Sequence, residues 1–309
     1  MLALTLLAGC GGESARDPAR VTLALDFVPN AAHAGIYGAV ASGAAEERGV
    51  ALRIRTPSAS TDGLKLLASG RADLAVLDIH DLGLARERGE DVKGIAAVVQ
   101  RPLAAVIARP PVRTPEELEG ERVGVTGLPS DEAVLRAVVQ NGGGDPHKVD
   151  SVTIGFSAVQ SLVAKRVAAA TAFWNVEGVT LRDRGVRTRE FRVEDYGAPA
   201  YPELVLVTTP RAIAERREEI EDTLEAIAEG VEFTARTPEP VVAAIAEAGG
   251  ARPAAIESQL RAVETALSPP LTLNRARLRE WAEFDVRFGI LKRRPDVDAT
   301  FDFSLAPPA

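Results

Sequence analysis

The sequence predicts an α/β fold of two lobes followed by a helical C-terminal region. Short apolar runs alternate with stretches of helical periodicity, which is the pattern of parallel sheets covered by helices. This alternation occupies residues 21–100 and returns between residues 110 and 200, and beyond Pro210 the chain becomes strongly helical. With 309 residues, the chain is long enough for about two domains.

The first α/β stretch opens with a strand over residues 21–27 and a loop that contains Pro29 and Asn30. A helix over residues 32–48 follows, and Gly49 ends it. The remaining elements are expected in this order: strand 50–55, helix 61–69, strand 72–77, helix 81–88 and strand 93–100.

The second stretch opens with a helix start at Thr114, where Pro115 and two acidic residues favour the first turn. Alternating elements follow: strand 120–126, helix 132–140, strand 152–156, helix 157–164 and strand 168–174. A strongly apolar strand over residues 204–208 precedes the helical region. Its predicted helices are 211–237, 240–248, 252–267 and 274–288.

Two extended apolar stretches that end in proline, residues 103–110 and 202–210, are the predicted crossings between the lobes. Two such strands side by side form a hinge, and a cleft between hinged lobes suits a small molecule because closure buries it on both faces. We expect a signal and tether in residues 1–20, a first lobe from residues 21–105 and 206–309, and a second lobe from residues 106–205.

Composition excludes several classes of function. The chain has a net charge of −8 with its basic residues scattered among carboxylates, so no nucleic-acid-binding surface is expected. Cys10 is the single cysteine, which excludes an intramolecular disulfide and a multi-cysteine zinc site. Neither a Walker loop nor a dinucleotide-binding glycine pattern occurs, so a nucleotide cofactor has no support. We expect no cofactor and no bound metal.

The amino terminus is an apolar run that is too short to span a bilayer and is typical of an export signal. Residues 7–10, Leu-Ala-Gly-Cys, resemble the bacterial lipobox, which implies that Cys10 carries a lipid anchor outside the cytoplasm. The positive charges that usually precede such a run are missing, so a frayed terminus with a chance cysteine remains the alternative.

Polar and aromatic residues gather at the turn after the first strand, where open α/β sheets bind their ligands. Asp26, Phe27, Asn30, His33 and Tyr37 belong to this turn. Together with residues 124–131, 174–178 and 196–205, the turn resembles periplasmic binding proteins that deliver thiamine pyrimidine precursors to ABC transporters. The resemblance covers about residues 21–290 and keeps the four motifs in the same order.

This resemblance implies a type II periplasmic-binding-protein-like fold with parallel-type sheets, flanking helices and a hinge of two crossing strands. It also implies a monomeric, extracytoplasmic protein that is not an enzyme. Its partners would be a small pyrimidine, an ABC transporter permease and, through the lipid anchor alone, a membrane.

An aminopyrimidine is a flat ring with an amine beside a ring nitrogen, so it favours aromatic faces and an acidic edge partner. Phe27, Tyr37, Trp174 and Tyr201 are the candidate aromatic walls, although the family often has tryptophan at the position of Phe27. Glu177 is the candidate partner of the amine and of a protonated ring nitrogen. Supporting polar groups are expected at Asp26, Asn30, His33, His80 and Asn175.

Each of these residues also has a structural interpretation. Trp174 at the end of an apolar strand suits a core, and Glu177 suits the first turn of a helix. His33 suits a helix cap, while Asp78 and Asp81 can solvate His80. Tyr201 borders a crossing and can serve the hinge alone.

Two alternative functions remain open. The first is a receptor of the same fold for riboflavin, an alkanesulfonate or another small aromatic solute, although a sulfonate would require arginine and backbone donors. The second is an enzyme similar to the eukaryotic pyrimidine synthases. That resemblance implies a cysteine-rich segment and a pyridoxal phosphate site, whereas the single cysteine of this chain, Cys10, lies outside the predicted fold, which argues against synthesis.

Overall fold

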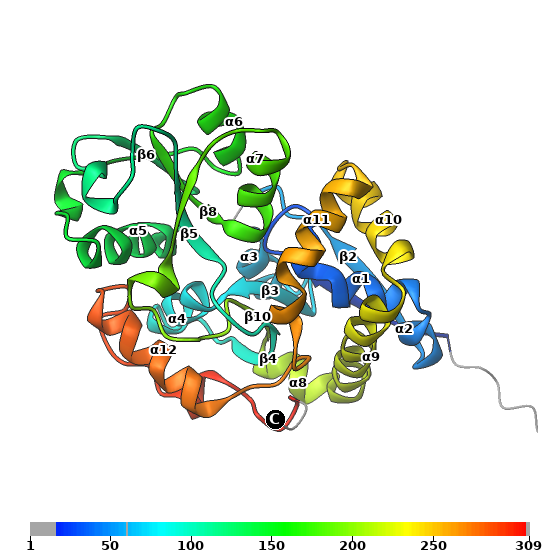
Figure 1. Cartoon of the computed structure of the whole chain (residues 1–309). Coiled ribbons are helices and arrows are strands. Elements are labelled where there is room, and N and C mark those ends of the chain that lie inside the picture. Colours follow the sequence, from blue (N-terminus) through cyan, green and yellow to red (C-terminus); the bar gives the residue numbers. More distant parts are fainter. Residues whose placement is uncertain (1–16, 60, 307–309) are drawn as a thin grey trace, which may run out of the picture.

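The computed structural model describes residues 17–59 and 61–306 and shows two five-stranded sheets with helices packed on them (Figure 1). This confirms the predicted α/β fold of two lobes with a helical C-terminal region. The predicted lipidation site at Cys10 lies outside the described residues. Across the described part of the chain, the helices are too short or too polar to cross a membrane.

The first sheet has the strand order β2-β1-β3-β10-β4. Most of its strands are apolar and largely buried because helices cover both faces, whereas the edge strand over residues 50–55 is partly exposed. They are β1 (Ala19–Ala24), β2 (Val50–Arg55), β3 (Leu74–Asp78), β4 (Lys93–Val99) and β10 (Leu204–Thr208).

The second sheet has the order β7-β6-β8-β5-β9, which repeats the pattern of the first. The charged strand β9 escaped prediction, because its sequence Arg-Glu-Phe-Arg carries one apolar side chain. The strands are β5 (Ala104–Ala108), β6 (Arg122–Val125), β7 (Asp150–Thr153), β8 (Ala169–Phe173) and β9 (Arg189–Arg192).

Both sheets are mixed, whereas the sequence predicted parallel-type sheets. In the first sheet β10 is antiparallel to β3 and β4, and in the second β5 is antiparallel to β8 and β9. These strands lie within the two predicted crossings, so each enters its sheet just after the chain has left the other one. Because the chain reaches each of these strands from the opposite lobe, the strand runs antiparallel to its neighbours. The local pattern of apolar residues does not indicate this direction.

The helices follow the predicted periodicity with breaks. The expected helix over residues 32–48 is divided at Gly43, which has a positive φ of 84°. The start predicted at Thr114 forms a short 3-10 helix. The helices before β10 are η1 (Ala31–His33), α1 (Ala34–Ala41), α2 (Ala44–Glu47), α3 (Asp62–Ala68), α4 (Ile79–Glu87), η2 (Pro115–Leu118), α5 (Pro129–Asn141), η3 (Pro146–Lys148), α6 (Ala158–Val163), the π-helix η4 (Trp174–Gly178), α7 (Val179–Asp183) and η5 (Val193–Tyr196).

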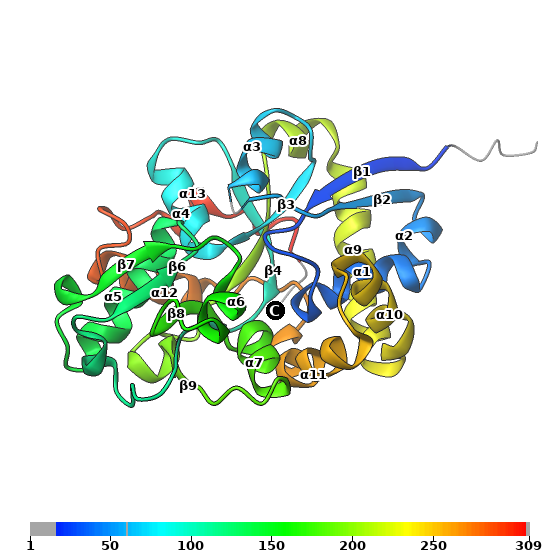
Figure 2. The ribbon, with the colours of Figure 1, turned by 90° about the horizontal axis from the view of Figure 1, so that it is seen from above.

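The C-terminal helices do not form a free tail, because they pack on both lobes. Helix α11 lies beside η1 of the first lobe and α7 of the second (Figure 2). At the other end of the molecule, Arg136 of α5 donates to the carbonyl of Phe288, just after α12. The helices are α8 (Pro210–Glu215), α9 (Arg217–Arg236), α10 (Pro238–Gly249), α11 (Pro253–Val263), η6 (Glu264–Leu267), α12 (Arg275–Arg287) and α13 (Val297–Thr300).

Strand β3 shows how the first lobe buries both faces of its sheet. Alternate side chains of a strand point to opposite faces. Leu74 and Val76 join the apolar cluster beneath α1 and α9, while Leu77 joins the cluster that contains Trp281 of α12. Strand β3 is therefore packed between two helical layers.

Candidate functional site

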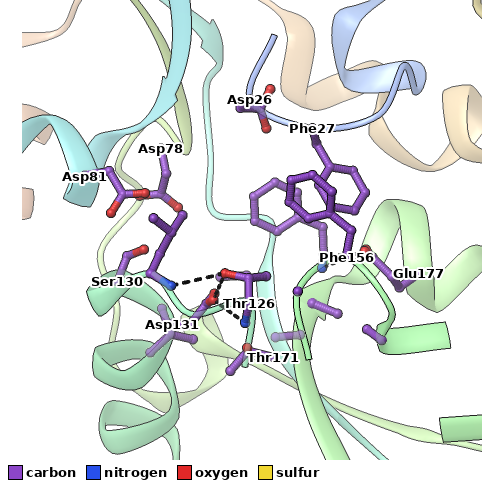
Figure 3. A pocket seen from close by; sticks show the side chains of 18 of the residues that line it. Asp26, Phe27, Asp78, Asp81, Thr126, Ser130, Asp131, Phe156, Thr171 and Glu177 are labelled. Atoms are coloured by element: carbon purple, nitrogen blue, oxygen red, sulfur yellow. Dashed lines mark hydrogen bonds between the residues drawn. The ribbon is translucent and has the colours of Figure 1, made fainter. Parts of the chain in front are cut away.

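A cavity lies between the two sheets, and residues of both lobes line it (Figure 3). The first lobe contributes residues that follow β1 and β3, and the second contributes residues of β5 and β8 and residues that follow β6, β7 and β8. Ligands of open α/β sheets bind outside the carboxyl ends of the strands, and this cavity has that position in both lobes. The lining side chains used below are Asp26, Phe27, Asp78, Asp81, Thr126, Ser130, Asp131, Phe156, Phe173 and Glu177.

Two phenylalanines meet across the cavity from opposite lobes. The ring centroids of Phe27 and Phe156 are 4.4 Å apart, and the rings are inclined by 71° in an edge-to-face contact. Phe173 adds a third aromatic residue to the lining. Phe27 was predicted at this site, whereas Phe156 was predicted only as the end of a strand. A flat heterocycle entering this end would therefore find aromatic side chains from both lobes.

Glu177 lines the same end of the cavity from η4. Its side chain is 8% exposed, and its Oε2 accepts a hydrogen bond from the backbone N–H of Phe173 at 3.1 Å. Burial raises the pKa of Glu177 to about 7. A carboxyl group that loses most of its hydration gains more from a charge-assisted bond to a ligand than an exposed one would.

Asp26 also lines the cavity and is held in place by the residues that follow it. His33 Nε2 lies 2.8 Å from Asp26 Oδ1, and His33 Nδ1 accepts from the backbone N–H of Asn30 at 3.3 Å. This arrangement assigns the Nε2 proton to the bond with Asp26. Asn30 caps η1 by accepting from the N–H of Ala32. His33 and Asn30 are buried behind Asp26 and act on the cavity through it.

Three further carboxylates stand at the opposite end of the cavity from Glu177, as Figure 3 shows. Asp78 ends β3 and caps α4, with Oδ1 accepting from His80 N at 2.7 Å. Asp81 lies in the first turn of α4. Asp131, in the first turn of α5, accepts from the backbone and the hydroxyl of Thr126. Their positions after strands and at helix starts were visible in the sequence, but acidic residues there are usually explained by the helix dipole.

Trp174 was predicted to form part of the ligand-binding wall, but it is not among the residues that line the cavity. It is 6% exposed, its indole N–H donates to the carbonyl of Pro102 at 3.2 Å, and the guanidinium of Arg192 lies 4.2 Å from the ring centroid. The indole thus ties η4 to the segment that crosses between the lobes. In this structure Trp174 is therefore a packed aromatic side chain, as its alternative, structural interpretation predicted.

Tyr201 and His80 also lie away from the cavity lining, in the interior. His80 Nδ1 is 2.6 Å from Asp285 Oδ1, and His80 Nε2 is 3.1 Å from the Tyr201 hydroxyl. Burial alone would lower the pKa of His80, but the negative charges of Asp285 and Asp78 outweigh it and raise the pKa to about 10. The pair therefore joins α4 to α12 as a buried ion pair.

The remaining predicted residues are buried as well. Tyr37 lies in α1 at 7% exposure, and burial raises its pKa to about 12. Asn175 is fully buried in η4, and neither its amide nitrogen nor its amide oxygen has a hydrogen-bond partner among the described residues. Side-chain direction at a strand-to-helix turn depends on the packing of both lobes, which the motif alone does not specify.

Comparison with known proteins agrees with this architecture. The profile of the family described as NMT1/THI5 like matches residues 30–241. The chain is 33% identical to the formylaminopyrimidine-binding protein of Halalkalibacterium halodurans over 245 residues, which are 77% of this chain and 74% of that protein. It is 23% identical to a 4-amino-5-hydroxymethyl-2-methylpyrimidine phosphate synthase of Legionella pneumophila over 71% of each chain.

Among solved structures, the periplasmic aliphatic sulphonate binding protein SsuA of Escherichia coli superimposes with a TM-score of 0.73. The alignment covers 92% of both chains at 14% identity, so it shows a shared fold. The fold is thus that of periplasmic binding proteins. With the profile covering more than half of its length and the match to the Halalkalibacterium protein, the chain belongs to the NMT1/THI5-like family.

Proposed function

We propose that this protein is the extracytoplasmic solute-binding component of an ABC importer and binds a thiamine pyrimidine precursor in the cavity between its lobes. Family membership and the similarity to a formylaminopyrimidine-binding protein support this function. The observation that carries the proposal is the position of Glu177, buried at the cavity wall on the same side as Phe27 and Phe156.

The chemistry of this end suits an aminopyrimidine edge. In the proposed complex the ring lies against Phe27 and Phe156, and the exocyclic amine and a protonated ring nitrogen donate to Glu177. Such a charge-assisted pair is stronger than a neutral hydrogen bond. Asp26, held by His33, is a second acceptor for donors at the ring edge.

The charge of the cavity disfavours anionic solutes. Five acidic residues line it, Asp26, Asp78, Asp81, Asp131 and Glu177, and no lysine, arginine or histidine is among the described residues of the lining. A sulfonate placed there would meet carboxylates instead of the cationic donors that anions require. The similarity in fold to a sulphonate-binding protein therefore does not extend to its ligand in this proposal.

Transport requires closure of the lobes around the solute. In our proposal the lobes comprise residues 21–105 with 206–309 and residues 106–205, and they move about the two crossing segments. A ligand that touches both lobes binds the closed state more tightly than the open one and so shifts the population toward closure. We further propose that Cys10 anchors a monomeric receptor to the outer face of the membrane, beside its permease.

Calorimetric titration tests the proposed ligand. We expect 4-amino-5-hydroxymethyl-2-methylpyrimidine or its formylaminopyrimidine relative to bind the purified chain, while riboflavin and taurine do not. Glu177→Gln should weaken pyrimidine binding by at least about tenfold, since a hydrogen bond to a charged group contributes about 1.5–3 kcal/mol. Glu257→Gln, at a half-exposed side chain of α11, is the matched control and should leave the affinity unchanged.

Two outcomes would contradict the proposal. Binding of riboflavin or taurine alone would assign another cargo to the cavity. Recovery of a chemically altered pyrimidine from the complex, detected by mass spectrometry, would indicate an enzyme. Recovery of the unchanged pyrimidine is the result expected of a receptor.

A further inference from the structure

We propose that Glu203 is a positioning residue, whose buried carboxylate joins the two crossing segments at the hinge and so keeps the two lobes in the relative placement that ligand binding requires. This inference rests on the proposed function and specifies which residue guides the closure of the same cavity. It starts from a hydrogen bond between two residues that lie 100 positions apart in the chain.

Glu203 lies in one crossing segment and binds the other. It is fully buried and directly precedes β10 of the first sheet. Its Oε2 accepts the backbone N–H of Leu103 at 2.5 Å and that of Ala104 at 3.2 Å. Ala104 is the first residue of β5 in the second sheet. One carboxylate therefore joins the points at which the chain enters the two sheets.

Backbone hydrogen bonds fix each side of this contact to its own sheet. The carbonyl of Glu203 accepts from the N–H of Ile79, which directly follows β3 of the first sheet. On the other side, Trp174 directly follows β8 of the second sheet. Its backbone N–H donates to the carbonyl of Leu103, and its indole N–H donates to the carbonyl of Pro102. The side chain of Glu203 is thus a link between two backbone segments that are each held in place.

A side chain suits a pivot better than a ladder of backbone bonds does. The side chain of Glu203 can change its torsion angles while its carboxylate stays on the same two N–H groups. Charge-assisted hydrogen bonds of this kind are strong when they are buried, and removal of the carboxylate would deprive both N–H groups of this acceptor. The contact can therefore persist while the lobes turn relative to one another.

The carboxyl group of Glu203 also contacts the cavity wall. Its Oε1 is buried without a donor among the described residues, and the side chain of Asp78 lies within hydrogen-bond reach of it. Burial raises the pKa of both carboxyl groups, although the positive charge of His80 opposes the increase. A proton held between the two groups supplies the bond. The contact therefore reaches Asp78, which lines the cavity (Figure 3).

Distances between the lobes of the ligand-free protein test the inference without any ligand. Spin labels are attached through Val40→Cys in α1 and Val163→Cys in α6, at exposed positions of opposite lobes. Cys10→Ser removes the native cysteine from the full chain. Electron paramagnetic resonance then gives the distribution of distances between the labels. We expect Glu203→Leu, which has no acceptor, to broaden this distribution.

Three further variants separate the hydrogen bonds from charge and from packing. Glu203→Gln keeps an acceptor for the two N–H groups and a donor for Asp78, so the distribution should stay as narrow as in the wild type. Glu203→Asp keeps the charge on a shorter side chain, so it should broaden the distribution, even if Glu203→Leu does not fold. Thr208→Val is the matched control, because Thr208 is fully buried on β10 and its hydroxyl donates to the carbonyl of Asp73 in the same lobe. It should leave the distribution unchanged.

Calorimetric titration with 4-amino-5-hydroxymethyl-2-methylpyrimidine adds a functional readout. Glu203→Leu and Glu203→Asp should weaken binding by at least about fivefold, since only the fraction of molecules with correctly placed lobes binds the ligand. Glu203→Gln and Thr208→Val should stay within about twofold of the wild type. A role in stability alone would not separate Glu203→Asp from the matched control.

The failures of this inference and of the proposed function are distinguishable. Unchanged distances in Glu203→Asp and in folded Glu203→Leu, or an equally broad distribution in Thr208→Val, would overturn the positioning role and leave the proposed function intact. A Glu203→Gln distribution as broad as that of Glu203→Leu would also overturn it, as would broadened distances with unchanged affinity. Wild-type protein that binds no pyrimidine would overturn the proposed function, while the distances still decide whether Glu203 positions the lobes.

Discussion

At the scale of single residues, the acidic groups of the cavity make the stability of the ligand-free protein depend on pH. Glu177 has a pKa of about 7 in the folded protein and an ordinary value of 4.5, and burial is the main cause. A raised carboxyl pKa means that the folded state binds its proton more tightly than the unfolded state. The resulting stabilisation is complete below the ordinary pKa and is lost as the pH rises through 7.

We therefore expect the free energy of unfolding of the ligand-free protein to decrease between about pH 5 and pH 8. Asp78, Asp81 and Asp131 act in the same direction, because burial raises the pKa of each. Glu177→Gln should flatten the profile by at most about 3 kcal/mol. Urea denaturation across this range measures it, and a stability that rises toward pH 8 would contradict the account.

The buried pair of His80 and Asp285 makes a second prediction. Both side chains are fully buried, so removing one partner leaves the other without compensation. Asp285→Ala should lower the free energy of unfolding by about 3–5 kcal/mol. Glu283→Ala, at an exposed position of the same helix, should change it little. Equal effects of the two substitutions in denaturant unfolding would show that the pair does not stabilise the fold.

Part of the cavity was predictable residue by residue. Glu177, Phe27 and Asp26 follow strands and face the cavity as their motifs suggested. Trp174 follows a strand and Tyr201 precedes one, yet both point into packed regions, next to Pro102 and His80 respectively. The difference is set by contacts with distant segments, so spacing along the chain does not encode it.

At the scale of elements, the contact between α1 and α9 depends on glycine. A Cβ atom at Gly230 of α9 would overlap the carbonyl oxygen of Gly35 and the backbone nitrogen of Ala39 in α1. Both overlapping atoms belong to the backbone of α1, so the overlap cannot be relieved by the movement of a side chain. The close packing of the two helices therefore requires that this position lack a side chain.

Gly230→Ala should accordingly destabilise the first lobe by about 1–3 kcal/mol or more, because overpacking forces the two helices apart. The intrinsic preference of alanine for helices acts in the opposite direction and is smaller. Thermal unfolding compared with Glu232→Ala, a largely exposed neighbour on α9, measures the effect. A gain in stability for Gly230→Ala would contradict the close approach.

The elements themselves were predicted better than their directions. Apolar runs located β1 to β4 and β10, and helical periodicity located α9 to α12. Strands β5 and β10 are antiparallel to their neighbours because the chain reaches each of them from the other lobe. The charged strand β9 forms because it pairs with β5. These features depend on partners far along the chain, so a local pattern carries no record of them.

At the scale of the whole molecule, the two lobes meet through Phe27 and Phe156 and through the contact of α11 with α7. If a ligand bridges the lobes, it should favour the closed arrangement. Small-angle X-ray scattering should then show a smaller radius of gyration when the pyrimidine is added. An unchanged radius at saturating ligand would contradict closure as the response to binding.

The most direct test of the account is a crystal structure of the protein grown with the pyrimidine that binds it. We expect a ring in the cavity between the two sheets, beside Phe27 and Phe156, with its exocyclic amine within hydrogen-bond distance of Glu177. A ring bound elsewhere, or a Glu177 side chain turned away from it, would contradict the account.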